Sequence, residues 1–201
     1  MGGSPERVPL VRPVIVWKVL ILASASPRRH ELLLAAGMDH VVRPASDSEI
    51  RRPEESPVNL VKRLAEEKAR AVECEPGNVV LGADTVVCVG DTLLGKPADE
   101  ADAVRMLRLL SGREHSVYTG ICLLVAHACV LDVARTDVSF ARLTEDEISE
   151  YTRSGEPVDK AGAYAIQGLA SKFILSITGS YANVVGLPVS LVYSHLKALL
   201  S

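Results

Sequence analysis

The chain has 201 residues, of which 48% are hydrophobic and 23% charged, and its formal net charge is −3. This composition is typical of a globular protein with one sizeable core, and no apolar run approaches the roughly 18 residues that a membrane span requires. A negative net charge excludes a chain-wide basic surface, so we expect neither nucleic acid nor membrane as a partner. The four cysteines form no CxxC pair, which favours a reducing, cytoplasmic location.

Residues 1–18 are predicted to be an N-terminal extension, followed by a single domain over residues 19–201. Part of the extension imitates a signal peptide, but Lys18 interrupts its apolar region and cleavage there would remove strand residues. The rest of the chain contains no internal repeat and no linker-like tract, which favours one domain.

The stretch from Leu20 to Gly37, LILASASPRRHELLLAAG, opens on an apolar run that predicts a buried central strand. Ser26 followed by Pro27 predicts the start of a helix, with the serine hydroxyl capping the first free amides. Gly37 predicts the end of that helix after about three turns.

Arg28 and Arg29 lie in the first turn of this helix, where the positive end of the helix dipole disfavours them. Positive charge and free amides at the end of a buried strand suit an anion with several oxygens, such as a polyphosphate. A solvated arginine pair beside an ordinary cap is an alternative that this stretch alone does not exclude.

A short strand is predicted at Val41–Pro44, before an acidic and basic loop that contains Asp47 and Glu49. A second helix is predicted to begin at Ser56 and Pro57, with the same design as the first.

Lys68 falls on the inward apolar stripe of that second helix, four residues after Leu64 and four before Val72. Its side chain either runs out to solvent along its neighbours or points into a pocket, and the pattern leaves both alternatives open.

The segment NVVLGADTVVCV, residues 78–89, predicts two strand pieces that GADT interrupts. Gly82 indicates a bulge or a close approach of another backbone. Asp84 is a carboxylate between apolar runs, where its desolvation must be met by a cation, a metal or a catalytic purpose, although a satisfied structural role is the alternative.

Gly90, Gly95 and Lys96 match the spacing of a phosphate-binding P-loop. Pro97 stands where the metal-binding hydroxyl should be and prevents the required helix from running through Lys96. We therefore reject a P-loop site.

The later elements are predicted from capping and apolar patterns. They are a helix after Asp99 that ends at Gly112, strands at 116–126 and 130–140, a capping-box helix over 145–154, strands at 173–177 and 183–185, and a last helix from Pro188. His115 is predicted to have a surface or capping role.

Asp159 and Lys160 could be only an exposed ion pair. Gln167, directly before Gly168, offers both an amide donor and an acceptor, as the reading of a base edge requires. Alone, that signal is weak.

Together these motifs resemble the Maf family of nucleotide pyrophosphatases, whose fold is close to that of inosine triphosphatase. The resemblance spans residues 19–199 and is carried by SASPRR at 24–29, EKA at 67–69, GADT at 82–85, KP at 96–97, SGREHSVYTG at 111–120, DKAGAYAIQG at 159–168 and NVVGLP at 183–188.

The resemblance implies hydrolysis of a nucleoside triphosphate between its α and β phosphates, with a divalent metal cation, Mg²⁺ or Mn²⁺. It implies that Asp84 is the proton acceptor and a metal ligand, and that Glu49 is an acidic residue near the metal. The implied phosphate and substrate contacts are Ser24, Ser26, Arg28, Arg29, Lys68 and Lys96.

Arg28, Thr85 and Gln167 match the specificity positions of the branch that acts on dTTP and UTP, which implies a role in preventing incorporation of modified nucleotides. In the loop with Glu49, Ser48 stands where family members often have an aspartate, so Asp47 is an alternative second acid.

Two alternatives stay open: the same reaction on 7-methyl-GTP or other non-standard nucleotides, and a nucleotide-binding inhibitor of septum formation. For the fold, the resemblance implies an α/β domain with a long twisted mixed sheet, flanking helices and a central substrate cleft. Homodimers are common in such relatives, although nothing in this sequence establishes one.

Overall fold

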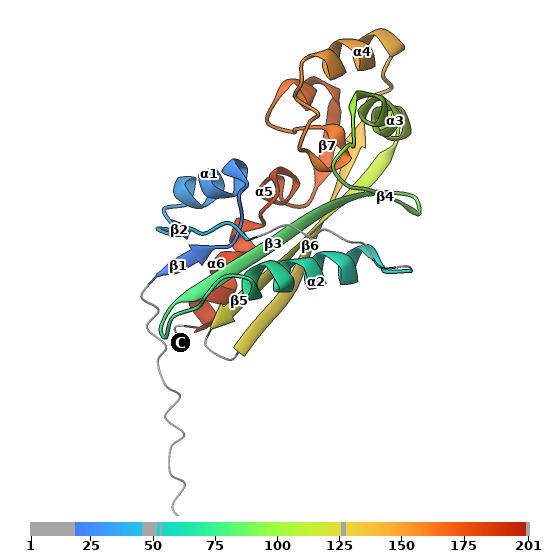
Figure 1. The fold of residues 1–201 in the computed structure, drawn as a ribbon. Coiled ribbons are helices and arrows are strands. Elements are labelled where there is room, and N and C mark those ends of the chain that lie inside the picture. The colour runs from blue at the N-terminus through green and yellow to red at the C-terminus, as the bar shows by residue number, and fades with distance from the viewer. Residues whose placement is uncertain (1–18, 46–51, 53, 126–127, 200–201) are drawn as a thin grey trace, which may run out of the picture.

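The computed structural model describes residues 19–45, 52, 54–125 and 128–199. They form a seven-stranded sheet in the order β2-β1-β3-β5-β6-β7, with β4 paired to β3 (Figure 1). The strands are β1 (Leu20–Leu22), β2 (Val41–Val42), β3 (Val79–Val89), β4 (Thr92–Leu94), β5 (Glu114–Val125), β6 (Ala128–Phe140) and β7 (Ile174–Thr178). β1 runs parallel to β2 and β3, and the other pairs are antiparallel, so the predicted mixed sheet is confirmed.

Helices flank this sheet on both faces. They are α1 (Pro27–Ala35), α2 (Pro57–Arg70), α3 (Glu100–Leu110), α4 (Glu145–Arg153), α5 (Tyr181–Val185) and α6 (Val189–Leu199), with 3₁₀ turns η1 (Ala161–Ala163) and η2 (Leu169–Phe173). α2 packs on one face of β1, β3 and β5, and α1 and α6 pack on the other. α3, α4 and the 3₁₀ turns surround a second core at the far end of the long strands.

Two glycines let α2 lie directly on the sheet. A side chain on Gly82 of β3 would overlap the backbone of Ala65, and one on Gly120 of β5 would overlap the backbone of Val61. The predicted close approach at Gly82 is therefore confirmed, but GADT does not interrupt the strand, since β3 is continuous from Val79 to Val89.

Helix caps explain most of the predicted helix starts. The side chains of Ser56, Asp99 and Thr144 each accept a hydrogen bond from a first-turn amide, and Thr144 forms the predicted capping box with Glu147. Ser26 lies at the N-cap of α1, but its side chain makes no capping hydrogen bond within the described structure, so that part of the prediction is wrong.

Two further predictions are wrong. Residues 183–185 belong to helix α5 rather than a strand, because Ser180 caps a short helix there by accepting from the amide of Asn183. His115 is 2% exposed rather than on the surface: it lies in β5 with Nε2 2.8 Å from the Tyr164 hydroxyl. Burial lowers the pKa of His115 to about 4.

The predicted acidic loop with Asp47 and Glu49 lies outside the described residues, as does the predicted N-terminal extension. The described helices include none whose length and apolar character would suffice to span a bilayer.

Candidate active site

A cleft of about 260 Å³ opens where the edge of β3 changes partners. β1 pairs with Val79–Leu81 of that edge, and β4 pairs with Val87–Val89. Between these two pairings, no described strand lies against this edge of β3, and Asp84 and Thr85 line the cleft there. The carboxyl end of β1 leads into α1 beside them. Open α/β sheets bind ligands at this kind of crevice.

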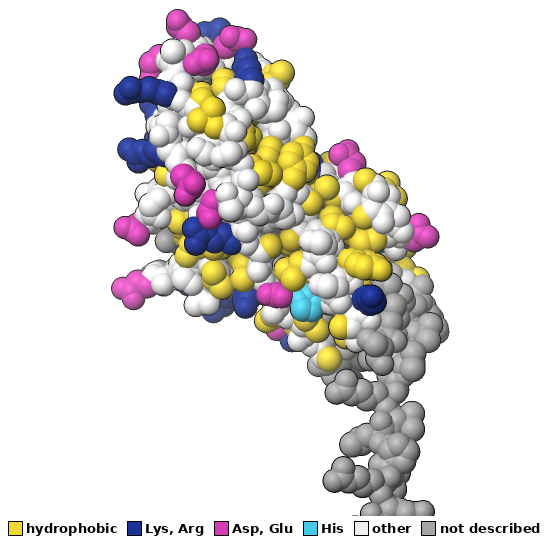
Figure 2. Space-filling model, turned by 180° about the vertical axis from the view of Figure 1, so that it is seen from behind, with side chains coloured by type: hydrophobic (Ala, Val, Ile, Leu, Met, Phe, Trp, Pro, Cys, Tyr) yellow, Lys and Arg dark blue, Asp and Glu magenta, His cyan; other side chains and the backbone are white. Residues whose placement is uncertain are grey.

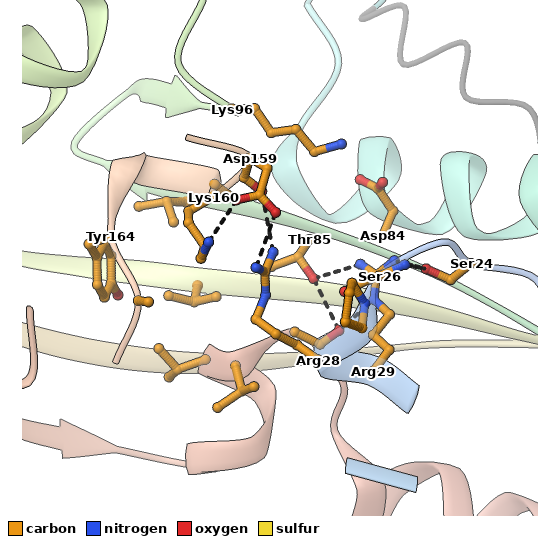
Figure 3. A pocket seen from close by; sticks show the side chains of 18 of the residues that line it. Ser24, Ser26, Arg28, Arg29, Asp84, Thr85, Lys96, Asp159, Lys160 and Tyr164 are labelled. Carbon is orange, nitrogen blue, oxygen red and sulfur yellow. Dashed lines mark hydrogen bonds and ion pairs between the residues drawn. The ribbon is translucent and has the colours of Figure 1, made fainter. Parts of the chain in front are cut away.

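The cleft brings together nine of the ten residues that the sequence assigned to the site (Figure 3). They are Ser24, Ser26, Arg28, Arg29, Lys68, Asp84, Thr85, Lys96 and Gln167. The tenth, Glu49, lies outside the described residues. The roles of all ten stay predictions, but these nine surround one cavity.

Lys68 and Asp84 form a buried ion pair on the α2 face of β3. Lys68 Nζ lies 2.7 Å from Asp84 Oδ1, and their side chains are only 9% and 8% exposed. Of the two alternatives for Lys68, the one that points into a pocket is therefore correct. Because such burial is costly for both charges, the pair is weak evidence for stability and favours a functional purpose.

The glycine-lined seat of α2 explains how this pair forms. Gly82 and Asp84 point to the same face of β3, and Gly120 pairs with Asp84 in the neighbouring strand. With no side chains at the two glycines, α2 approaches closely enough for Lys68 to reach the carboxylate.

Arg29 is held by three separate segments around the cleft. Nη1 donates to Ser24 Oγ at 3.0 Å, Nη2 to Thr85 Oγ1 at 3.2 Å, and Nε to the carbonyl of Gly186 at 2.9 Å. The residue is 9% exposed. Arg29 therefore joins the β1–α1 turn, β3 and the segment after α5, a bracing role that the sequence did not reveal.

A buried polar chain continues from Thr85 to α5. Thr85 Oγ1 lies 3.0 Å from Thr119 Oγ1, which donates to the Asn183 carbonyl at 3.3 Å. The Asn183 amide donates in turn to Val117 O and to Thr136 Oγ1, each at 3.0 Å. These contacts fix α5, whose last residues and Gly186 line the cleft.

Arg28, also in the first turn of α1, contacts Asp159 in the segment before η1. Its Nη1 is 3.3 Å from Asp159 Oδ2, and its Nη2 donates to the Asp159 carbonyl at 3.2 Å. Lys160 Nζ is 2.6 Å from Asp159 Oδ1, so the two residues do form an ion pair (Figure 3). The pair is not merely an exposed one, since the Lys160 side chain is only 16% exposed and both residues line the cleft. The sequence missed its third member, Arg28, because 131 residues separate the arginine from the aspartate.

Partial burial opposes ionisation of Asp159. The hydrogen bond from Lys160 and the charge of Arg28 outweigh it, and the pKa of the carboxyl lies below its ordinary value. Asp159 therefore stays an anion at neutral pH, beside two cations that line the cleft.

The N-terminus of α1 opens into the same cavity, since Ser26, Pro27 and Arg28 line it. The backbone amide of Ser26 donates to Ser24 Oγ at 3.2 Å, while the Ser26 hydroxyl leaves the first-turn amides uncapped within the described structure. A helix N-terminus of this kind attracts anions through its amides and its dipole.

Asp84 is the candidate metal ligand among the described residues of the cleft. The described residues contain no cluster of three or more His, Cys, Asp or Glu side chains that could hold a metal. Asp84 nevertheless supplies a hard oxygen donor beside the cationic groups, and Mg²⁺ is commonly held by one or two carboxylates together with substrate phosphates and water. The donor set therefore fits such an ion.

Tyr164, Ala165 and Gln167 form the end of the cleft that lies away from Asp84 and the N-terminus of α1. The Gly168 amide donates to the Ala165 carbonyl at 3.1 Å, which closes a four-residue turn with Gln167 at its third position. Gln167 is exposed there, at the rim.

A family model described as Maf-like protein matches residues 19–199. A protein from Koribacter versatilis named dTTP/UTP pyrophosphatase is 49% identical over 179 residues, which cover 89% of this chain and 93% of that protein. A protein of the same name from Anaeromyxobacter dehalogenans is 53% identical over 175 residues, covering 85% and 89%.

Among solved structures, the Ham1 protein of Staphylococcus aureus matches with a TM-score of 0.51 and 13% sequence identity, covering 90% of this chain and 99% of that one. At this identity the match shows a likeness of fold alone.

Proposed function

Because this chain belongs to the Maf family, we propose that it is a nucleoside triphosphate pyrophosphatase that converts dTTP and UTP to the monophosphate and pyrophosphate. One observation carries the proposal: a single cleft holds Asp84 and Lys68 as a buried pair, with Lys96, Arg28 and the open N-terminus of α1 around them. Relatives about half identical to this chain bear the name of that activity.

The cationic groups suit a polyphosphate. A nucleoside triphosphate carries about four negative charges, and Arg28, Lys68 and Lys96 together with the helix end would neutralise charge that develops as the phosphoryl bond breaks. Arg29, which is already bound to three neighbours, would hold the walls of the site in register rather than serve only as a phosphate contact.

Asp84 is the proposed proton acceptor. A water molecule would attack the α phosphorus, the bond from that phosphorus to the bridging oxygen would break, and pyrophosphate would leave with the bond electrons. The water proton would pass to the Asp84 carboxylate. Lys68, 2.7 Å from Asp84 Oδ1, would orient the carboxylate and balance its charge.

A divalent cation completes the proposal, with Asp84 as one ligand and Glu49 as the other. When bound, Mg²⁺ or Mn²⁺ would draw charge from the phosphate oxygens. We expect no pyrophosphate release in EDTA and recovery on addition of either ion.

The base preference rests on Arg28, Thr85 and Gln167. These residues match the specificity positions of the branch that acts on dTTP and UTP, which is the activity that the relatives' names give. Gln167 lines the cleft, and in the proposal its amide would contact the edge of the pyrimidine. An enzyme with this preference would remove modified pyrimidine triphosphates from the nucleotide pool.

Release of pyrophosphate from dTTP, UTP, CTP, 7-methyl-GTP and ITP tests the proposal. Selective release from dTTP and UTP is expected. Release from another nucleotide would keep the reaction and discard the base preference. Nucleotide binding without release would favour a regulator, for instance of septum formation.

The proposal includes a cytoplasmic location and a homodimer. All four cysteines are free thiols, which suits a reducing compartment. Val41 and Tyr193 are exposed and line a mostly apolar groove beside β2, and Val42 next to them is also exposed. Figure 2 shows hydrophobic side chains grouped along the reverse face of the molecule. Sedimentation analysis of the full chain tests the dimer.

A further inference from the structure

The turn that carries Gln167 is fastened by two residues that do not line the cleft, Tyr151 and Glu156. The Tyr151 hydroxyl accepts a hydrogen bond from the amide of Ala165, the first residue of the turn, at 3.3 Å. The same hydroxyl donates to Glu156 Oε1 at 2.8 Å. Tyr151 is 2% exposed, so this anchor lies inside the far core.

Glu156 holds the other end of the turn. Its Oε2 accepts from the amide of Leu169 at 2.9 Å, and its Oε1 accepts from the amide of Ala170 at 3.4 Å. These amides begin η2, whose own N-cap residue, Gly168, has no side chain to cap it. Glu156 therefore supplies the cap from a distance in sequence, with the charge that a helix start favours.

The packing at Gly168 shows how closely this carboxylate is fitted. A β carbon at Gly168 would overlap the carboxylate of Glu156, so only a glycine leaves room for it. Both ends of the turn, at Ala165 and Leu169, are thus tied to one hydrogen-bonded pair, and the carboxylate packs against the backbone between them.

We infer that Glu156 is a positioning residue that sets base selectivity, by fixing the Ala165–Gly168 turn and through it Gln167. The inference rests on the proposed function, in which Gln167 reads the base. A glutamine amide is both donor and acceptor, so by rotating it can match either a 4-oxo or a 4-amino pyrimidine. Discrimination between them therefore depends on what holds its backbone and limits its orientations.

Glu156→Ala removes the acceptor of three donors, so the turn loses its fastening at one end. The ratio of kcat/KM for UTP over CTP is expected to fall by about tenfold, mostly through KM, because lost orientation weakens recognition of the favoured base. Glu156→Gln keeps one acceptor oxygen for Leu169 and is expected to lose less. Tyr151→Phe keeps both Glu156–amide bonds at η2 and should lose less than Glu156→Ala.

Glu147→Ala is the matched control. Glu147 also caps a helix with its carboxylate, since Oε2 accepts from the Thr144 amide at 2.7 Å. This bond lies at the start of α4, before Tyr151, and involves no residue of the turn. Its loss is expected to lower the melting temperature and leave the UTP to CTP ratio unchanged. An equal fall in this control would reduce Glu156 to a general structural role and overturn the inference.

Equilibrium binding of UTP and CTP in EDTA separates the inference from the proposed function. If the wild-type protein releases no pyrophosphate but Glu156→Ala and Glu156→Gln lower the UTP to CTP binding ratio, the proposed reaction fails and the positioning role stands. If Gln167→Ala lowers the ratio and both Glu156 variants keep it, the positioning role fails alone. If Gln167→Ala and both Glu156 variants all keep the ratio, then both the positioning role of Glu156 and base reading by this turn are wrong. Should Glu156→Ala not fold, Glu156→Gln decides.

Discussion

The two ends of the cleft are built in different ways. At the phosphate end, the reactive groups stand on regular elements: Lys68 on α2 and Asp84 on β3, which backbone packing at two glycines brings together, and Arg28 on α1. At the base end, Gln167 stands on a turn that side-chain hydrogen bonds hold from outside. A rigid framework suits chemistry that needs fixed charges, whereas a fastened turn can be altered without disturbing them.

This difference predicts separable effects. Changes at Lys68 or Asp84 should alter the rate for every nucleotide alike, because every triphosphate presents the same phosphates. Changes at the base end should alter the ranking of nucleotides and affect the highest rate much less.

The largest effect is expected for Asp84→Asn. The substitution keeps the shape of the side chain but removes the proton acceptor and the partner charge of Lys68, so turnover should fall by about a thousandfold or more for all substrates. Pyrophosphate release measures the loss, and circular dichroism checks that the fold persists. Asp132→Asn is the control, since Asp132 pairs with His195 rather than with a cleft residue. Near-normal turnover of Asp84→Asn would remove Asp84 from the proposed chemistry.

Gly120→Ala should be strongly destabilising, although it adds only a single methyl group beside the phosphate end. The added carbon meets the backbone of Val61 and Lys62, which cannot swing away as a side chain could, so we expect a loss of about 3 kcal/mol in the free energy of unfolding. Urea denaturation measures it. Gly95→Ala, where nothing lies within 4 Å of the new carbon, should be nearly neutral in stability. Equal stability of the two variants would show that α2 has room to move.

Features that depend on residues close together in sequence could be predicted from the sequence. Local capping predicts the helices that begin after Ser56, Asp99 and Thr144, and apolar runs predict the long strands. Both signals depend only on neighbours in sequence. Lys68 and Asp84 could be predicted as site residues because a charge is unusual on an apolar helix stripe or between apolar runs.

Other features depend on contacts distant in sequence and were missed. The 131-residue separation of Arg28 from Asp159 and the three partners of Arg29 leave no periodic trace. His115 looked like a residue at a strand boundary, and only the fold shows that Phe140 and Tyr164 enclose it. Residues 183–185 read as a strand because their apolar run is too short to distinguish a strand from one helical turn.

The stability of the protein should depend on pH through the core beneath the base end, because that core contains a neutral His115. Burial lowers its pKa to about 4 from an ordinary value of 6.5, so the unfolded chain binds more protons between these values. The stability that depends on a neutral His115 is therefore fully present above pH 6.5 and is lost as the pH falls toward 4. Between pH 7 and 5 we expect a loss of about 2 kcal/mol in unfolding free energy.

Urea denaturation at both pH values measures this effect, with His115→Gln as the comparison because it cannot take up the proton. The difference between pH 7 and pH 5 should shrink in the variant. The same difference in both proteins would assign the acid sensitivity to other groups.

The smallest effect is expected for Asp159→Asn, at the boundary between the two ends. Asp159 places a negative charge beside Arg28 and Lys160, where it competes with an incoming phosphate for both cations. The aspartate side chain is 57% exposed, so solvent screens the competition, and we expect KM to fall only about two- to fivefold at low salt for all nucleotides. Glu145→Gln changes the net charge equally at an exposed pair with Arg108 and should leave KM unchanged. A rise in KM for Asp159→Asn would mean instead that the carboxylate holds Arg28 in position for the substrate. In that case side-chain contacts would position residues at the phosphate end as they do at the base end.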